Sequence, residues 1–98
     1  ESRIAYQGVL REAGQPVTGS RDMVFNFFNN NSCSNTPVET VVKDKVPVVN
    51  GLFNANLPVD SSKFNGQGLW LQVQVGGVSL GCESLSVVPY ALSLRPGA

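Results

Sequence analysis

The feature that most constrains this chain is a period-two alternation of apolar and polar residues, which recurs in short runs along nearly its whole length. The clearest run is LWLQVQV at 69–75, in which every second residue is apolar. Side chains of a β-strand point alternately to the two faces of a sheet, so this period is typical of a strand with one buried face. Similar runs occupy 4–10, 23–28, 53–57, 78–82 and 85–94. We therefore expect short strands throughout.

The segments between these runs predict turns and loops, and none of them predicts a helix. Asn50-Gly51 stands between two extended apolar runs, and this pair favours a two-residue hairpin because both turn residues must adopt positive φ. EAGQPVTG at 12–19 and PVDSSKFNGQG at 58–68 are polar and rich in Gly and Pro, which predicts loops. The segment 38–49 is rich in β-branched residues and predicts a further strand, which Pro47 restricts to a sheet edge or a bulge.

Seven or eight short strands at this spacing predict an all-β fold. The favoured architecture is an antiparallel immunoglobulin-like β-sandwich, and a small β-barrel is the second choice. A chain of 98 residues is the size of one domain, so we expect a single β-sandwich domain over 1–98, of which the terminal strand 1–11 is a candidate donor strand.

The charge balance excludes several classes of partner. Seven Lys and Arg residues balance seven Asp and Glu residues, so the electrostatic footprint of a nucleic-acid-binding protein is missing. Charged residues make up only 14% of the chain, which suits an extracellular protein or one largely covered by partners. No apolar segment is long enough to span a membrane and no basic-then-apolar leader is present. If the protein is exported, we expect Glu1 to begin the mature chain.

Two cysteines, Cys33 and Cys82, are far apart in the sequence and form no CxxC motif. The chain has no histidine, so a zinc site would need an uncommon set of ligands. We expect a disulfide closing a loop of about fifty residues, which stabilises by about 3 to 4 kcal/mol in the loop-entropy model. The alternative is a pair of buried free thiols in a cytosolic protein.

The sequence offers little for catalysis. Without histidine there is no Ser-His-Asp or Cys-His nucleophile system. The carboxylates are scattered over strand ends and loops, and no pair has a spacing that indicates a glycosidase. We therefore expect no enzymatic activity, no cofactor and no metal site.

Two surface features invite a functional interpretation. The loop NNNSCSNTP at 29–37 contains the sequon Asn30-Asn31-Ser32, and Ser32, Ser34 and Thr36 are candidates for O-linked sugar. The alternative is an unmodified Asn-rich loop. Trp70 lies on the polar face of its strand, where it could stack on a sugar, pack under a loop or contact a partner.

The first and last strands carry apolar alternation close to both ends of the sequence. Each could complete the sheet of its own chain or pair with a neighbouring subunit. We favour the first strand as the donor, because the Gly- and Pro-containing connection at 12–16 is flexible and a bridged Cys82 would hold the last strand near the core. The interface residues of the first strand would be Ile4, Tyr6, Val9 and Leu10. Those of the alternative donor would be Val88, Tyr90, Leu92 and Leu94.

Five motifs occur in register: IAYQGVL, GQPVTGSRDMVFNFF, VPVVNGLFNANL, LWLQVQV and SVVPYALSL. This series resembles the N-terminal β-sandwich domain of many secreted or surface proteins of environmental bacteria, with the pattern IxYQGxL, GxPVxG, NGLF, LWL and PYA. The resemblance implies an extracellular structural or surface module without enzymatic activity. More loosely, the chain resembles subunits of extracellular filaments that polymerise by exchanging a strand.

These observations predict a structural subunit of an extracellular bacterial filament that assembles head to tail by β-strand exchange or augmentation. Contacts of this heterologous kind do not close, so they produce a filament rather than a dimer. The expected partners are copies of the same chain in a helical homopolymer, together with covalent glycans, and neither nucleic acid nor a membrane span is expected. The alternative is a monomeric secreted surface module that binds carbohydrate or another surface protein through Trp70 and nearby loops.

Overall fold

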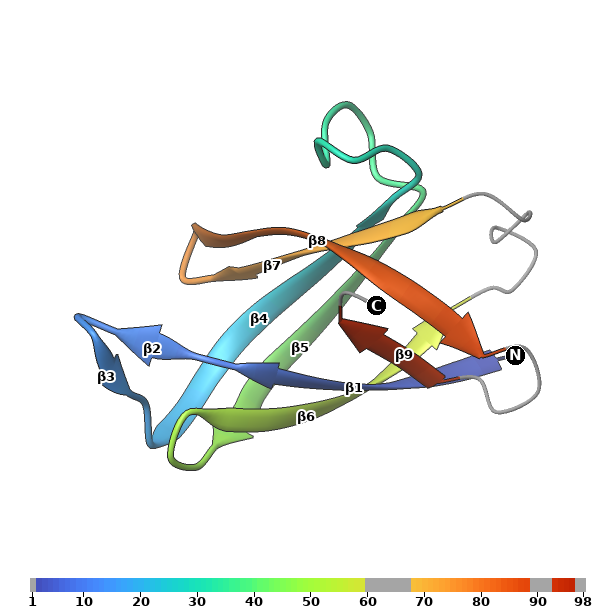
Figure 1. The fold of residues 1–98 in the computed structure, drawn as a ribbon. Coiled ribbons are helices and arrows are strands. Elements are labelled where there is room, and N and C mark those ends of the chain that lie inside the picture. Colours follow the sequence, from blue (N-terminus) through green and yellow to red (C-terminus); the bar gives the residue numbers. More distant parts are fainter. Residues whose placement is uncertain (1, 60–67, 89–92, 97–98) are drawn as a thin grey trace.

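The computed structural model of the protein describes residues 2–59, 68–88 and 93–96. These residues form nine strands and no helix, as the alternating pattern predicts (Figure 1). The strands are β1 (Ser2–Val9), β2 (Arg11–Glu12), β3 (Gln15–Pro16), β4 (Gly19–Phe28), β5 (Glu39–Val48), β6 (Leu52–Val59), β7 (Leu69–Val75), β8 (Val78–Val88) and β9 (Ser93–Pro96).

Seven strands form one sheet in the order β5-β4-β7-β8-β9-β1-β6. This sheet folds over so that β1 and β6 pack against β4, β5 and β7, which gives two layers with the core between them (Figure 1). The predicted β-sandwich is confirmed. Neighbouring strands are antiparallel, with the exception of β1 and β9, which are parallel.

Aromatic residues from both layers meet in the middle of the core. Tyr6 of β1, Phe25 of β4 and Phe53 of β6 contact one another, with ring centroids 6.1 to 6.4 Å apart. Each such pair contributes about 0.5 to 1.5 kcal/mol beyond its area burial. The three rings therefore join β1 and β6 to the opposite layer.

The Asn50-Gly51 hairpin between β5 and β6 is confirmed. Both residues have positive φ, 51° and 81°, as the predicted turn requires. A Cβ atom added at Gly51 would lie 3.1 Å from the carbonyl oxygen of Leu10 and 3.1 Å from the Cβ of Pro16. Glycine is therefore needed here both for its conformation and for the close approach of the segment that follows β1.

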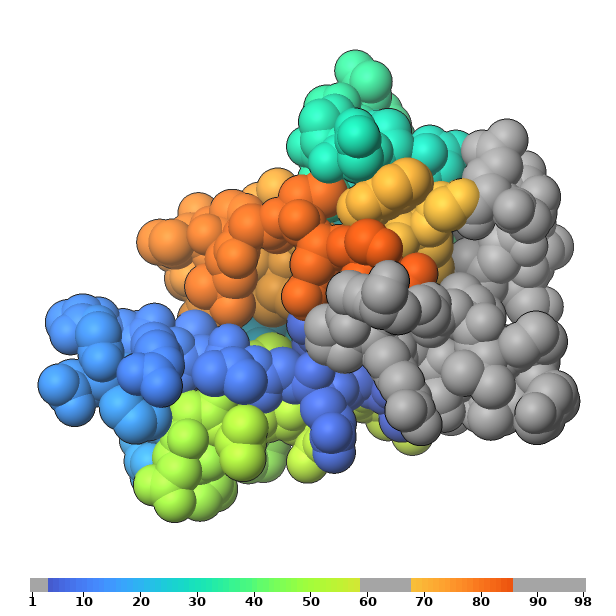
Figure 2. Space-filling model, viewed as in Figure 1, coloured from blue at the N-terminus to red at the C-terminus, as the bar shows by residue number. Residues whose placement is uncertain are grey.

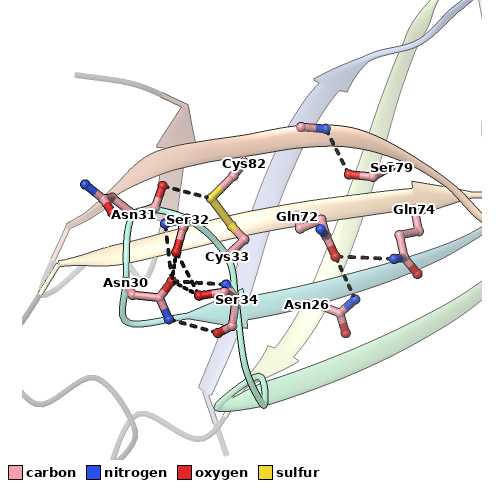
Figure 3. The surroundings of a disulfide bond; sticks show 11 residues. Asn26, Asn30, Asn31, Ser32, Cys33, Ser34, Gln72, Gln74, Ser79 and Cys82 are labelled. Atoms are coloured by element: carbon pink, nitrogen blue, oxygen red, sulfur yellow. Dashed lines mark hydrogen bonds between the residues drawn. A yellow bond between two sulfur atoms is a disulfide. The ribbon is translucent and has the colours of Figure 1, made fainter.

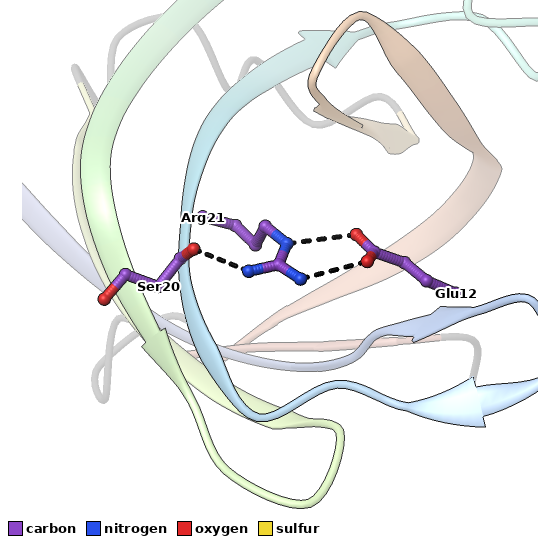
Figure 4. A network of polar contacts seen from close by, with 3 residues as sticks. All are labelled: Glu12, Ser20 and Arg21. Carbon is purple, nitrogen blue, oxygen red and sulfur yellow. Dashed lines mark hydrogen bonds and ion pairs between the residues drawn. The ribbon is translucent and has the colours of Figure 1, made fainter.

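The predicted loop at 12–19 is more ordered than expected, because β2 and β3 pair across an Ala13-Gly14 turn. Beside this hairpin, the guanidinium of Arg21 donates to both carboxylate oxygens of Glu12, at 3.0 and 3.1 Å, and to the carbonyl oxygen of Ser20 at 2.8 Å (Figure 4). This pairing lowers the pKa of Glu12 and raises that of Arg21. Most of the other predicted loop, 58–68, lies outside the described residues, and its first two residues extend β6.

Candidate functional site

The first strand is an integral part of the sandwich of its own chain. β1 pairs with β6 over its whole length, from Ser2 opposite Val59 to Val9 opposite Leu52. Ile4 and Tyr6 are 1% and 4% exposed and lie in the core, whereas Val9 is 62% exposed. Of the four interface residues predicted in this segment, Ile4, Tyr6 and the following Leu10 are therefore buried within the chain, and only Val9 faces outward.

The segment after β1 is fixed rather than loose. The backbone N–H of Leu10 donates to the carbonyl oxygen of Gly51 at 2.7 Å, and its carbonyl accepts from the N–H of Val17 at 3.2 Å. The N–H of Gly51 donates in turn to Val17 at 2.8 Å. Leu10 is buried, so this hydrogen-bonded corner lies within the candidate donor segment 1–11.

The last described strand lies beside the first one. β9 pairs with β8 at residues 85–88 and meets β1 at one position, where Ser93 is opposite Ala5. The backbone of Val88 and Leu94 belongs to the β8–β9 ladder, whereas Tyr90 and Leu92 lie outside the described residues. Within the described part of the chain, both terminal strands thus pair inside the same sheet.

A groove opens where β1 and β8 separate beyond β9. Among the described residues, β1 pairs only with β6 over residues 6–9, and β8 pairs only with β7 over residues 78–84. The groove has a volume of about 350 Å³, and Figure 2 shows β1 and β8 facing each other across this gap. Its lining comes from Tyr6, Gln7, Gly8, Val9, Phe53, Val73, Leu80, Gly81, Cys82 and Glu83.

One hydrogen bond crosses the groove. The hydroxyl of Tyr6 on β1 donates to the carboxylate of Glu83 on β8. Burial of the hydroxyl, together with this carboxylate partner, raises the pKa of Tyr6 well above its usual range. The Tyr6–Glu83 bond therefore fastens β1 to β8 where the two strands share no ladder.

We expect Tyr6→Phe to change how stability depends on alkaline pH. A tyrosine in the unfolded chain loses its proton near pH 10, whereas the folded protein holds the proton of Tyr6 to higher pH. The stabilisation is therefore complete below about pH 10 and is lost as pH rises toward the folded pKa. Urea unfolding across this range should show a steeper loss for the wild type than for Tyr6→Phe. If the free energies of unfolding of the wild type and Tyr6→Phe fall in parallel as pH rises, folding does not raise the pKa of Tyr6.

Gly8 allows the aromatic cluster to pack against β1. A Cβ atom added at Gly8 would lie 2.4 Å from Cζ of Phe53 and 3.0 Å from Cε2 of Tyr6. Gly8→Ala should therefore destabilise the protein by about 1 to 3 kcal/mol, although alanine suits a strand better than glycine. Chemical denaturation would measure this loss. In a double-mutant cycle with Phe53→Leu the penalty should shrink, and an unchanged penalty would rule out this contact as its cause.

The predicted disulfide between Cys33 and Cys82 is present, with a Cα–Cα distance of 5.8 Å. It ties the loop that follows β4 to β8, close to the groove (Figure 3). Cys33 is buried and has a positive φ of 49°. The loop conformation and the bridge therefore depend on each other.

Asn30 organises the loop that contains the predicted glycosylation residues (Figure 3). Its side-chain oxygen accepts from the backbone N–H groups of Ser32 and Ser34, at 3.2 and 3.0 Å, and its amide nitrogen donates to the carbonyl oxygen of Ser34 at 3.0 Å. The hydroxyls of Ser32 and Ser34 share a hydrogen bond of 2.8 Å, and Thr36 is exposed. The amide of Asn30 thus has a structural role, and glycosylation at these residues stays a prediction.

Trp70 is half-buried on the outer face of β7. It stands opposite Phe28 in the β4–β7 register, and Phe28 is only 3% exposed. A Cβ atom added at Gly68 would lie 2.7 Å from Cη2 of Trp70, so the indole ring covers the Gly68 backbone. Part of the ring surface that a sugar would need is therefore occupied, which favours packing within the chain.

The described residues contain no group of three or more residues suited to holding a metal ion. They also contain no helix that is long and apolar enough to cross a membrane. The polar groups of the described lining are the Tyr6–Glu83 pair, Gln7 and the backbone edges of two strands. Such an arrangement is chemically suited to binding an extended backbone.

Sequence reasoning did not identify Glu83, the groove or the pairing of β1 with β9. Glu83 and Tyr6 are 77 residues apart, and nothing in either local sequence connects them. The alternating pattern places Val78 and Leu80 on a buried face, but the structure leaves them 65% and 44% exposed, and no local sequence feature distinguishes this run from the buried ones.

Comparison with known proteins identifies a family for this chain. A family model described as "Domain of unknown function (DUF8740)" matches residues 5–87. No curated protein and no solved structure matches the chain. The matched range includes most of β1, the disulfide, the hairpin at Asn50-Gly51 and nearly all of β8.

Proposed function

Since the chain belongs to the DUF8740 family, whose function is unknown, its role must be inferred from its own structure, and we propose that it is a structural subunit of an extracellular bacterial filament. In this proposal, β1 leaves its own sandwich and occupies the same position in the next subunit. Secretion and surface location belong to the proposal, and both follow from the composition and from the resemblance to secreted bacterial domains.

The observation that carries this proposal is the position of β1. It is a complete strand in register with β6, it places Ile4 and Tyr6 in the core, and it makes few ladder contacts on its other side. A second copy of β1 would find the same backbone partners and the same pockets. Exchange would therefore conserve the interactions of the strand while linking two subunits.

The fixed corner after β1 defines the hinge of the exchange. Leu10 is held by Gly51 and Val17, so Ser2–Val9 can swing outward while the core beyond Leu10 stays in place. The disulfide between Cys33 and Cys82 holds β8 against the loop after β4. The frame that receives an incoming strand is therefore rigid on the β8 side.

Exposed apolar residues near the hinge support association between copies. Val9, Val49 and Leu52 are each about 60% exposed, at 62%, 60% and 61%. Val9 is opposite Leu52 in the β1–β6 register, and Leu52 bridges to Val49, so the three form one patch. Apolar patches on a protein with so few charges favour contact with another protein surface.

Head-to-tail exchange is the form that produces a filament. If each copy gives β1 to the next and receives β1 from the previous one, the contact is heterologous and chain growth stays open. Two copies that exchanged β1 reciprocally would instead close as a dimer. The exposed loop with Asn30, Ser32, Ser34 and Thr36 would carry the glycans of such a filament on its surface.

Electron microscopy of concentrated, native protein tests this proposal. We expect uniform fibrils with a repeat of one subunit, in which density for β1 crosses from one subunit to the next. Well-folded particles of about 10.4 kDa that stay dispersed at high concentration would contradict the filament. Closed dimers would contradict head-to-tail growth but not strand exchange.

A further inference from the structure

The edges that face the groove lack the lysine and proline residues that protect the outer strand β5. The outer edge strand β5 carries Lys43, Lys45 and Pro47, and β6 at the other end carries Pro58. Lysine and proline on edge strands discourage pairing with another chain. In contrast, residues 6–9 of β1 and 78–84 of β8 include no lysine, arginine or proline. Among the described residues, these two edges have no further partner strand and no such protection, so they are open to strand addition.

The chain itself shows that the gap accepts an extended strand. β9 occupies the far part of the same gap, antiparallel to β8 and parallel to β1. A strand that continued along this line would lie between residues 6–9 and 78–84. It would run in the same direction as β1, so a β1 strand from a second copy would enter with the polarity it needs to replace the resident strand.

The side chains of the groove also fit a strand with one apolar face. Phe53 and Val73 line it, and Val9 and Leu80 stand on either side, 62% and 44% exposed. Glu83, the one charged residue in the described part of the lining, accepts a hydrogen bond from Tyr6. An incoming strand with apolar residues at alternate positions would cover these surfaces without burying an unpaired charge.

We propose that the groove between β1 and β8 is the entry site for β1 of a second copy. The incoming strand pairs with the open edge of β8, next to the resident β1, before it displaces that strand. The identity of this occupant rests on the proposed function. The presence of a strand-accepting site rests on the open edges, the polarity set by β9 and the apolar lining.

A peptide of residues 1–11, ESRIAYQGVLR, tests the site on the intact protein. The peptide is titrated into isotope-labelled protein to about 1 mM, a concentration that detects weak binding, and amide chemical shifts are followed by NMR. We expect shifts at residues 6–9 and 78–84. A peptide in which Ile4 and Tyr6 are replaced by serine is the control and should bind more weakly.

Two matched variants locate the binding site. Leu80→Lys places a charge in the groove and should weaken peptide binding by about tenfold or more, since it removes an apolar contact. Val42→Lys makes the same kind of change at an exposed residue of β5 and should leave binding unchanged. Both side chains are exposed, so the folded state should persist in each variant, and circular dichroism checks this.

The outcomes separate the entry site from the filament. No shifts at about 1 mM, shifts confined to β6 or the β5 edge, or equal binding by the two lysine variants would overturn the entry site. If the peptide binds in the groove but the protein never forms fibrils, the entry site is supported and the filament is contradicted. If Leu80→Lys forms fibrils at the wild-type rate, the filament is supported and the entry site is contradicted.

Discussion

Removal of residues 1–7 should leave a chain that is unstable on its own and unable to polymerise. The deletion takes Ile4 and Tyr6 out of the core and leaves most of β6 without a partner strand. Losing one large core side chain costs about 2 to 5 kcal/mol, and small domains have only about 5 to 15 kcal/mol in total. Urea unfolding should therefore show a loss of at least about 5 kcal/mol, or no cooperative transition.

The same deletion offers a direct control, because the missing strand can be supplied from outside. A peptide of residues 1–11 should restore a cooperative transition and raise the melting temperature in proportion to its concentration. The peptide with serine in place of Ile4 and Tyr6 should not. A truncated chain that keeps wild-type stability, or that polymerises as the full chain does, would show that β1 is dispensable.

Loss of the disulfide should have the second-largest effect. Cys33 and Cys82 are separated by 49 residues, and a bridge closing a loop of that length stabilises by about 4 kcal/mol in the chain-entropy model. The variant Cys33→Ser, Cys82→Ser should therefore unfold at much lower urea concentration. Its loop around Asn30 should exchange amide hydrogens faster, because the bridge no longer holds this loop against β8.

Reduction of the wild type gives the matched comparison for the serine variant. The reduced protein and the double-serine variant should have similar stabilities, since both lack the cross-link and keep the same core. Hydrogen exchange in β4, which is paired on both sides with β5 and β7, should change only through the loss of global stability. If the free energies of unfolding of the oxidised and reduced proteins differ by less than about 1 kcal/mol, the disulfide does not stabilise the fold by restricting the unfolded chain.

Local patterns were sufficient to predict the strands and the main hairpin. Alternation predicts a strand with one buried face, and this is confirmed for β1, β4, β6 and β7. The strand β8 is also present, but its residues Val78 and Leu80 are exposed rather than buried. Asn50-Gly51 predicts its turn because few other residue pairs adopt positive φ at both positions. The segment at 12–19 was harder to predict, since the β2–β3 hairpin is exposed and its pairing depends on the neighbouring corner at Leu10 and Gly51.

The candidate site depends on contacts between distant parts of the chain, which a single sequence does not reveal. The alternation of Ile4 and Tyr6 shows that β1 has an apolar face, but not that β9 lies parallel to it. The position of Cys82 near Cys33 was predictable because only two cysteines exist. The Tyr6–Glu83 bond was not, because a carboxylate on β8 could have met many partners.

Intermolecular cross-linking tests the exchange of β1 most directly. Ala5 and Asn56 are both exposed and are opposite each other in the β1–β6 register. One chain carries Ala5→Cys and another carries Asn56→Cys, and the two are mixed under assembly conditions and oxidised. A disulfide between the two chains requires β1 of one copy to pair with β6 of the other.

We expect a covalent dimer on a non-reducing gel from this mixture, and much less from Ala5→Cys mixed with Asn54→Cys, since Asn54 is opposite Gln7. A single chain carrying both Ala5→Cys and Asn56→Cys should cross-link internally when kept dilute and monomeric. Fibrils that contain no Ala5–Asn56 cross-link between chains would show that β1 stays in its own subunit.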